Sequence, residues 1–328
     1  MIPYILQRFV LMFVTLFFVT LVTFAVIELP PGDFLDTYVS SLRASGDSLD
    51  DAEIASLRQR FGLGLPIHER YFKWISNIVL RGDFGYSFGW NKPVSELIWE
   101  RVGITVAISL VALLITWVLG FIIGVYSAVK QYSLGDYFFT TFSFIGLGIP
   151  DFLLALVLLW VGFKYFGENL SGLFSREFQT APWSMAKLWD MIKHLWVPLL
   201  ILGTSGTAGM IRIMRANLLD ELRKPYVETA RAKGLSEMKL IMKYPVRLAL
   251  NPFISSAGWA LPGLINGATI ISIVLSLPTT GPILLNALLS QDMYLAASFI
   301  LILSALTVIG TMISDILLAW LDPRIRFQ

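Results

Sequence analysis

The stretch VGITVAISLVALLITWVLGFIIGVYSAV, residues Val102 to Val129, contains no charged side chain. A helix needs about 20 mostly apolar residues to cross the hydrocarbon core of a bilayer. This stretch is long enough to do so. The rest of the chain has the same character, since 56% of its 328 residues are hydrophobic and 15% are charged, against about 25% charged in soluble proteins. The sequence therefore predicts a membrane protein built from helices.

Five further stretches are long and apolar enough to span a membrane: residues 9–27, 137–163, 195–213, 253–275 and 295–321. Prolines interrupt three of them, but neighbouring helices in a bundle can satisfy the backbone groups that a proline leaves unpaired. We expect the first span to be a retained helix, because the IELPPGD that follows it offers no small-x-small cleavage site for a signal peptidase. The fold class is therefore predicted to be an all-α polytopic membrane protein with six transmembrane helices.

The composition excludes several kinds of chemistry. The chain has no cysteine, so disulfides, thiolate metal sites and cysteine nucleophiles are absent. The two histidines, His68 and His194, are far apart in sequence, and we expect no histidine-based metal site or catalytic triad. No G-x-x-x-x-G-K-[ST] pattern occurs, so we expect no nucleotide in a P-loop of this chain. A net charge of +2 does not indicate a nucleic acid partner.

Loop charges predict how the chain is oriented. The segment from Arg212 to Arg247 contains nine basic residues and four acidic ones. Cytoplasmic loops of membrane proteins carry an excess of lysine and arginine, so we expect this segment to lie in the cytoplasm. Six spans then place both termini in the cytoplasm. Residues 30–101 and 164–194 fall outside, the first as a small folded cap and the second as a loop with turn-forming residues.

The expected cap begins with an amphipathic helical pattern at Ile54, Leu57 and Phe61, and continues with the aromatic-rich RYFKWISNIVLRGDFGYSF. Its rings have two interpretations, a platform for a peptide or sugar, or the core of the cap and its membrane anchor. We favour the second. The rings concerned are Tyr71, Phe72, Trp74, Phe84 and Tyr86.

A basic stretch, PYVETARAKGLSEMKLIMKY, residues Pro225 to Tyr244, breaks the apolar pattern. Pro225 suits the first turn of a helix, where its missing N–H would be unpaired anyway. We expect this helix to run to about Lys233 and to end at Gly234 in a left-handed conformation. Ser236 is expected to cap a second short helix, and Glu237 suits the positive end of that helix.

The second short helix has an apolar strip, formed by Leu235, Met238 and Met242 at helical spacing with Ile241 beside them. Two interpretations fit this strip. The pair of helices either lies on anionic lipid as an interfacial element, or docks in a groove of a cytoplasmic partner. The residues alone favour neither.

The chain as a whole resembles the B-type permease subunit of the oligopeptide/dipeptide (peptide/nickel) ABC importer family. YVETARAKGL is similar to the EAA loop of importer-type ABC permeases. Other matching stretches occur in the family's order from one end of the chain to the other. They include ILQRFVLMFVTLFFVTLVTFAVIELPPGD, GLGLPIHERYFKWISNIVLRGDFGYSF, GLGIPDF and DILLAWLDPRIR.

The resemblance implies a type I ABC importer permease core and a division of the chain into named parts. These are an N-terminal transmembrane helix at 1–29, an extracytoplasmic cap at 30–101, the core at 102–321 with an external loop at 164–194 and a cytoplasmic coupling loop at 214–250, and a cytoplasmic tail at 322–328. The location implied is the cytoplasmic (inner) membrane of a bacterium or archaeon.

The resemblance also implies partners and a coupling site. A homologous C-type permease would complete the pathway, two cytoplasmic ATPase subunits would bind ATP and Mg, and an extracytoplasmic binding protein would deliver the solute. This chain would hold no cofactor and carry no enzymatic activity. Matched residue by residue, the ATPase-coupling interface would comprise Glu228, Ala230 and Gly234, with Tyr226, Arg231, Lys233 and Leu235 as neighbours.

The function implied is ATP-driven uptake of di- or oligopeptides by alternating access. An oligosaccharide or another small solute is the alternative cargo within the same machinery. An ion-coupled secondary carrier that needs no ATPase, or a signalling or scaffold membrane protein, are alternatives from other classes. Against a carrier, the sequence shows no inverted repeat of the kind that many carriers have.

Two residues are candidates for the translocation pathway. Asp151 lies near the middle of the third expected span, where a carboxylate is costly unless it faces protein or water. It either lines the pathway or bonds to backbone groups freed by Pro150. Ser272 stands where relatives often carry a glutamate. Elsewhere, Asp315 is expected to pair with Arg212 or Arg215, and the small residues between positions 255 and 267 are expected to pack against a partner permease or to line the pathway.

Overall fold

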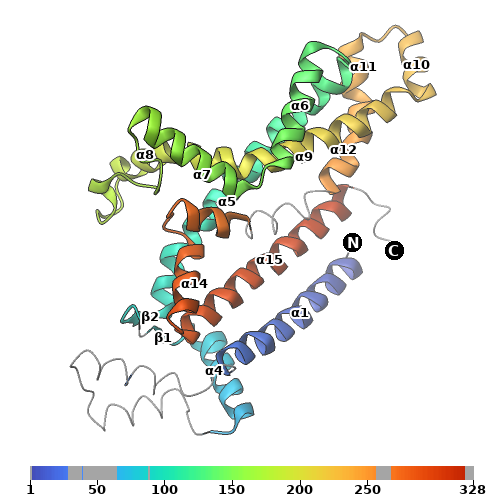
Figure 1. Cartoon of the computed structure of the whole chain (residues 1–328). Coiled ribbons are helices and arrows are strands. Elements are labelled where there is room, and N and C mark those ends of the chain that lie inside the picture. The colour runs from blue at the N-terminus through green and yellow to red at the C-terminus, as the bar shows by residue number, and fades with distance from the viewer. Residues whose placement is uncertain (1, 29–38, 40–64, 88, 256–266, 322–328) are drawn as a thin grey trace. The chain divides into compact units, whose positions relative to one another are not determined.

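A computed structural model of the chain describes residues 2–28, 39, 65–87, 89–255 and 267–321 (Figure 1). The described residues form helices, apart from connections and one short antiparallel hairpin. In the hairpin, Tyr86 pairs with Pro93 and Ser87 pairs with Lys92. The chain divides into two compact units, which we describe separately. The first unit comprises residues 1–8, 105–278 and 310–328, and the second unit comprises residues 9–104 and 279–309.

Three long helices have residues in both units: α1 (Ile2–Glu28), α5 (Val94–Val129) and α15 (Met293–Leu321). The other elements of the second unit are α4 (Ile67–Arg81), β1 (Tyr86–Ser87), β2 (Lys92–Pro93) and α14 (Thr280–Leu289). Those of the first unit are α6 (Leu134–Gly148), α7 (Asp151–Val161), α8 (Met185–His194), α9 (Trp196–Leu222), α10 (Pro225–Ala232), α11 (Glu237–Lys243), α12 (Pro245–Ser255) and a helix over residues 267–274.

Four of these helices, α1, α5, α9 and α15, are long and apolar enough to cross a membrane. Helices α6 and α7 pass the same test together, but they are bent by 102° where they meet. The described residues therefore provide four spans, or five if the bent pair is one span. Residues 256–266, in the middle of the expected span 253–275, lie outside the described residues, as do the expected helix around Leu57 and the tail at 322–328.

The bend corrects the expectation of one continuous span over residues 137–163. Helix α6 ends at Gly148, and Ile149 has an extended backbone with φ −94° and ψ 121°. A residue before proline is disfavoured in the helical conformation because the proline ring clashes with it, so Pro150 forces the break. A new helix, α7, starts directly after Pro150, and the Pro150 carbonyl accepts bonds from Leu153 N and Leu154 N.

Helix α9 is the central element of the first unit, and it contacts α6, α7, α8 and α12. It also lies very close to α5. An ideal Cβ on Gly120 would come within 2.3 Å of Met210 Cβ, and one on Gly124 within 2.6 Å of Met214 Cβ. Two glycines four residues apart thus form a flat strip on α5 that admits the two methionines of α9, as small-xxx-small pairs do in membrane helices.

The second unit has its own aromatic core. Tyr71 and Trp74 of α4 pack with Phe24 of α1 and with apolar residues of α15, and the Tyr71 hydroxyl shares a hydrogen bond of 2.8 Å with Thr20. Phe84 is buried too, so these three rings are core residues as expected. Phe72 is different, because 65% of it is exposed.

The segment 164–194 has more structure than the loop that the sequence predicts. It contains most of a π-helical turn (Gly162–Phe166), a 3₁₀ turn (Arg176–Phe178) and α8. Ser184 caps α8 by accepting a bond from Lys187 N. Asp190 of α8 accepts bonds from Ser175 N and Oγ at 2.7 and 2.5 Å. The sequence carries a signal for α8, because SMAKLWDMIKH combines a capping serine with an amphipathic run.

We predict that Gly120→Ala destabilises the protein. The added methyl group meets the Met210 side chain, and overpacking of this kind costs about 1–3 kcal/mol. Gly209→Ala is the control, because a Cβ at Gly209 meets nothing within 4 Å and alanine is favoured over glycine in helices by about 1 kcal/mol. Thermal unfolding in detergent, followed by tryptophan fluorescence, should give a lower apparent midpoint for Gly120→Ala only. Equal midpoints would contradict the close α5–α9 contact.

Candidate functional site

The candidate site is the helix pair α10–α11, which connects α9 to α12. Pro225 is the first residue of α10, and Gly234 follows that helix with φ +77°. Only glycine adopts this left-handed conformation without steric cost. Ser236 precedes α11 in the cap position with an extended backbone, although its side chain makes no capping hydrogen bond. The predicted arrangement of helix, left-handed turn and second helix is confirmed.

The inner face of this pair is covered by the chain's own core. Val227, Ala230, Leu240 and Ile241 are all buried. They belong to one cluster with residues of α5, α9 and α12, namely Ala128, Met210, Met214, Leu218, Val246, Ala249 and Phe253. The pair is therefore packed onto the long helices as one body. Ala230, which the resemblance assigns to a coupling interface, faces this core with 8% of its surface exposed.

Polar contacts fix the pair at both of its turns. The Tyr226 hydroxyl donates to Glu221 Oε2 at 2.7 Å, and Lys224 Nζ donates to Glu221 Oε1 at 2.6 Å. Burial and the neighbouring Glu221 carboxylate raise the pKa of Tyr226. Across the second turn, Arg231 Nε donates to Glu237 Oε1 at 2.6 Å, and this guanidinium lowers the pKa of the Glu237 carboxyl. The first contact ties α10 to the last turn of α9.

The outer face of the pair is open. Its exposed residues include Glu228, Arg231, Lys233, Gly234, Met238, Lys239, Met242 and Lys243. Met238 is 73% exposed and Met242 is 43% exposed, whereas Leu235 is half-buried. The expected apolar strip is therefore divided: its methionines face outward and α11 packs through Leu240 and Ile241. Exposed methionines are flexible and polarizable, and suit contacts with a partner surface.

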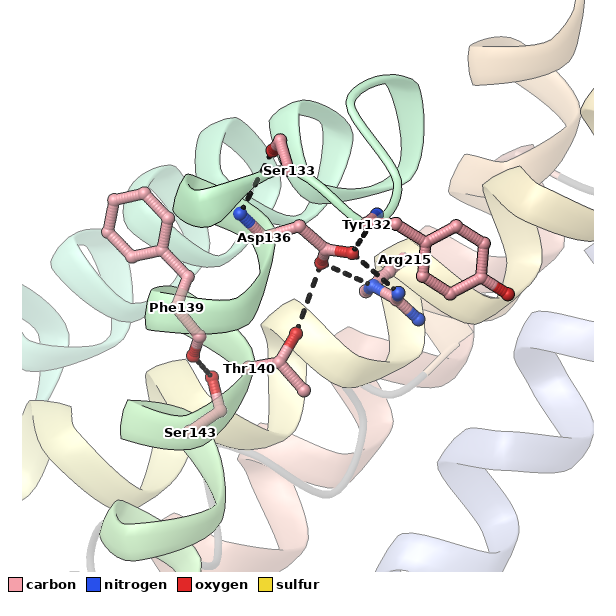
Figure 2. A network of polar contacts seen from close by, with 7 residues as sticks. All are labelled: Tyr132, Ser133, Asp136, Phe139, Thr140, Ser143 and Arg215. Atoms are coloured by element: carbon pink, nitrogen blue, oxygen red, sulfur yellow. Dashed lines mark hydrogen bonds and ion pairs between the residues drawn. The ribbon is translucent and has the colours of Figure 1, made fainter.

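A bidentate ion pair lies near this site (Figure 2). Arg215 Nε and Nη2 of α9 donate to Asp136 Oδ1 and Oδ2 of α6, each at 2.8 Å. Asp315 instead pairs with Arg8 at 3.1 Å. The expected pairing of Asp315 with Arg212 or Arg215 is therefore wrong, because Asp136 satisfies Arg215.

Sequence reasoning missed Asp136, although a signal for it was present. SLGD, residues Ser133 to Asp136, has the S-x-x-D spacing of a capping box, and Ser133 Oγ does accept a bond from Asp136 N. Its partner Arg215 lies 79 positions further along the chain. No local pattern could have joined the two.

The two pathway candidates have polar partners within the first unit. Asp151 lies in the first turn of α7 and accepts a bond of 3.3 Å from Ser205 Oγ of α9. Ser272 is 1% exposed and donates to the Thr269 carbonyl of its own helix. In the part of the chain that the structure describes, no group of three or more histidine, aspartate or glutamate residues has a geometry that could hold a metal ion.

Comparison with known proteins identifies the relatives of the chain. A family model described as "Binding-protein-dependent transport system inner membrane component" matches residues 120–327, and a second model, of the N-terminal part of such a membrane component, matches residues 1–109. The chain is 32% identical over 331 residues to the oligopeptide transport system permease protein AppB of Bacillus subtilis. It is 30% identical over 344 residues to the dipeptide transport system permease protein DppB of Alkalihalophilus pseudofirmus. Both alignments cover 100% of each chain.

We predict that Gly234→Val disorders the turn between α10 and α11. A non-glycine residue in the left-handed region costs about 1–2 kcal/mol, and a β-branched one is the least suited to it. Gly234→Asn is the control, since asparagine tolerates this conformation. Hydrogen–deuterium exchange should show faster exchange over residues 225–243 in Gly234→Val and near-unchanged exchange in Gly234→Asn. Equal exchange in both variants would contradict the role of the turn.

Proposed function

The chain belongs to the family of binding-protein-dependent transport system inner membrane components, and from this premise we propose that it is the permease subunit of an ATP-driven importer of di- or oligopeptides. The observation that carries the proposal is its full-length similarity to permease subunits of peptide transport systems. A second, homologous permease would complete the pathway, and a binding protein outside the membrane would deliver the peptide.

The α10–α11 pair is proposed to dock on an ATPase subunit. Its inner face is buried in the chain's own core, while its outer face presents Glu228, Lys233 and the two methionines. A helix bound by a groove typically offers such a strip of apolar and charged side chains. Membership of a transport-system family favours docking on a protein partner over the alternative of lying on lipid.

The mechanism follows from the connection between this pair and the long helices. Arg223 and Lys224 separate α9 from α10, and α11 leads through Tyr244 into α12. When ATP closes the partner subunits, the displaced pair moves α9 and α12 as levers, and a cavity shared with the second permease opens outward. Hydrolysis of ATP then returns the complex to its starting conformation. ATP and Mg would be bound by the ATPase subunits and not by this chain.

We further propose that both termini lie in the cytoplasm and that residues 30–101 and 164–194 lie outside. The excess of basic residues between Arg212 and Arg247 supports this orientation. The ion pair between Arg8 and Asp315 supports a common side for the two termini, because it joins the first turns of α1 to the last turns of α15.

We predict that Glu228→Lys weakens association with the ATPase subunits. Reversing an exposed charge in a docking surface places like charges together, which reduces affinity by about tenfold or more. Glu177→Lys is the matched control, since it makes the same change at an exposed site outside the pair. Co-purification from detergent-solubilised membranes should lose ATPase with Glu228→Lys alone. If the ATPase subunits co-purify with both variants, their docking surface lies elsewhere on the chain.

We predict ATP-dependent peptide uptake by the complete complex in proteoliposomes. Labelled di- and oligopeptides should accumulate with ATP and binding protein, and a labelled oligosaccharide should not. Accumulation of the oligosaccharide alone would mean that the complex is an ATP-driven importer of oligosaccharides and not of peptides. Peptide uptake driven by an ion gradient without ATP would overturn the importer and favour a secondary carrier.

A further inference from the structure

The pair of Asp136 and Arg215 joins helices that the sequence places far apart. Two parallel N–H···O bonds of 2.8 Å hold the guanidinium against the carboxylate. The Asp136 side chain is 2% exposed and that of Arg215 is 24% exposed. A bidentate pair of this kind fixes direction as well as distance, and its carboxylate is shielded from solvent.

Asp136 also connects the pair to the turn between α5 and α6. Its Oδ2 accepts a bond of 2.9 Å from Tyr132 N, and its Oδ1 accepts one of 3.1 Å from Thr140 Oγ1 (Figure 2). Ser133 caps α6 through Asp136 N. The Asp136 carboxylate thus links three parts of the first unit: the turn between α5 and α6, the first two turns of α6, and helix α9.

Arg215 lies on the part of α9 nearest the α10–α11 pair. It precedes the end of α9 at Leu222 by two turns, or about 10 Å at 1.5 Å per residue. Glu221, in the last turn, holds α10 through Tyr226. A displacement of the helix pair therefore reaches Arg215 through a short, continuous helix.

The other end of α6 leads to the bend at Pro150 and then to α7. Asp151 of α7 contacts α9 again through Ser205, at 3.3 Å. Between the two polar contacts, Gly146 of α6 lies closely against Thr204 and Ala208 of α9. Packed helices of this type can slide past each other by small shear movements, whereas the bidentate pair resists sliding.

We propose that Asp136 and Arg215 are positioning residues that make α6 follow α9 when the α10–α11 pair moves, so that ATP-driven motion reaches the bent α6–α7 segment. The inference rests on the proposed function of the helices α10 and α11 as the coupling element. It assigns to these two side chains a role in transmitting motion and not in binding ATP or solute.

The main test replaces both charges at once, with Asp136→Asn/Arg215→Met. Removing one partner would leave an uncompensated buried charge, whereas neutralising both often preserves folding. The complete complex, reconstituted with its ATPase and binding protein, is assayed for labelled dipeptide uptake and ATP hydrolysis together. We expect normal assembly, continued hydrolysis and a fall of at least about fivefold in uptake per ATP, which is the lower end of coupling between linked sites.

Two further variants complete the design. Asp136→Glu keeps Arg215 and a carboxylate that can accept both of its bonds, and should keep most of the uptake per ATP. Arg8→Met/Asp315→Asn removes a different ion pair of the first unit and should leave uptake per ATP at the wild-type value. A structural contribution alone would lower the amount of complex without changing this ratio.

Unchanged uptake per ATP in Asp136→Asn/Arg215→Met would overturn the proposal. Failure of this variant to assemble would also count against the proposal, because the ion pair would then be a folding requirement. An equal fall in uptake per ATP in the Arg8→Met/Asp315→Asn variant would count against it as well. Failure of the proposed function looks different, since the wild-type complex itself would then show no ATP-dependent uptake.

Discussion

Helix α9 must approach α5 closely enough for Met210 and Met214 to lie against Gly120 and Gly124. Lipid tails are as apolar as leucine, so helices in a membrane gain their association from such close packing and from interhelical hydrogen bonds. Because α9 holds α5 on one side and α6, α7 and α12 on others, it gives the first unit its shape. The candidate coupling helices then continue from its end, and their position is a consequence of where α9 lies.

Much of the local structure could be predicted because its causes are local. Apolar length predicts α1, α5, α9 and α15, and the backbone demands of proline and glycine predict the start of α10 and its end at Gly234. The break between α6 and α7 had an equally local cause, since Pro150 restricts Ile149. The apolar run on both sides of Pro150 has the length of one span, and this length hides the break.

The interactions that the sequence could not predict are those between distant residues. The partner of Arg215 depends on which helices are neighbours. Opposite charge alone made Asp315 an expected partner, whereas the structure has Asp136. The division of the strip on α11 has the same origin. Helical spacing places Leu235, Met238 and Met242 along the helix, but the core formed by α9 and α12 decides that Leu240 and Ile241 face inward.

The buried inner face of α10 and α11 also bears on how a complex would be built. Val227, Ala230, Leu240 and Ile241 are covered by side chains of the same polypeptide, so the proposed docking element is held in place by this chain's own core. A partner then meets a preorganised surface and loses little conformational entropy on binding. With the ATPase subunits docked there as proposed, membrane insertion and recruitment of these subunits would be separate events, and one of them could leave and be replaced without unfolding the membrane component.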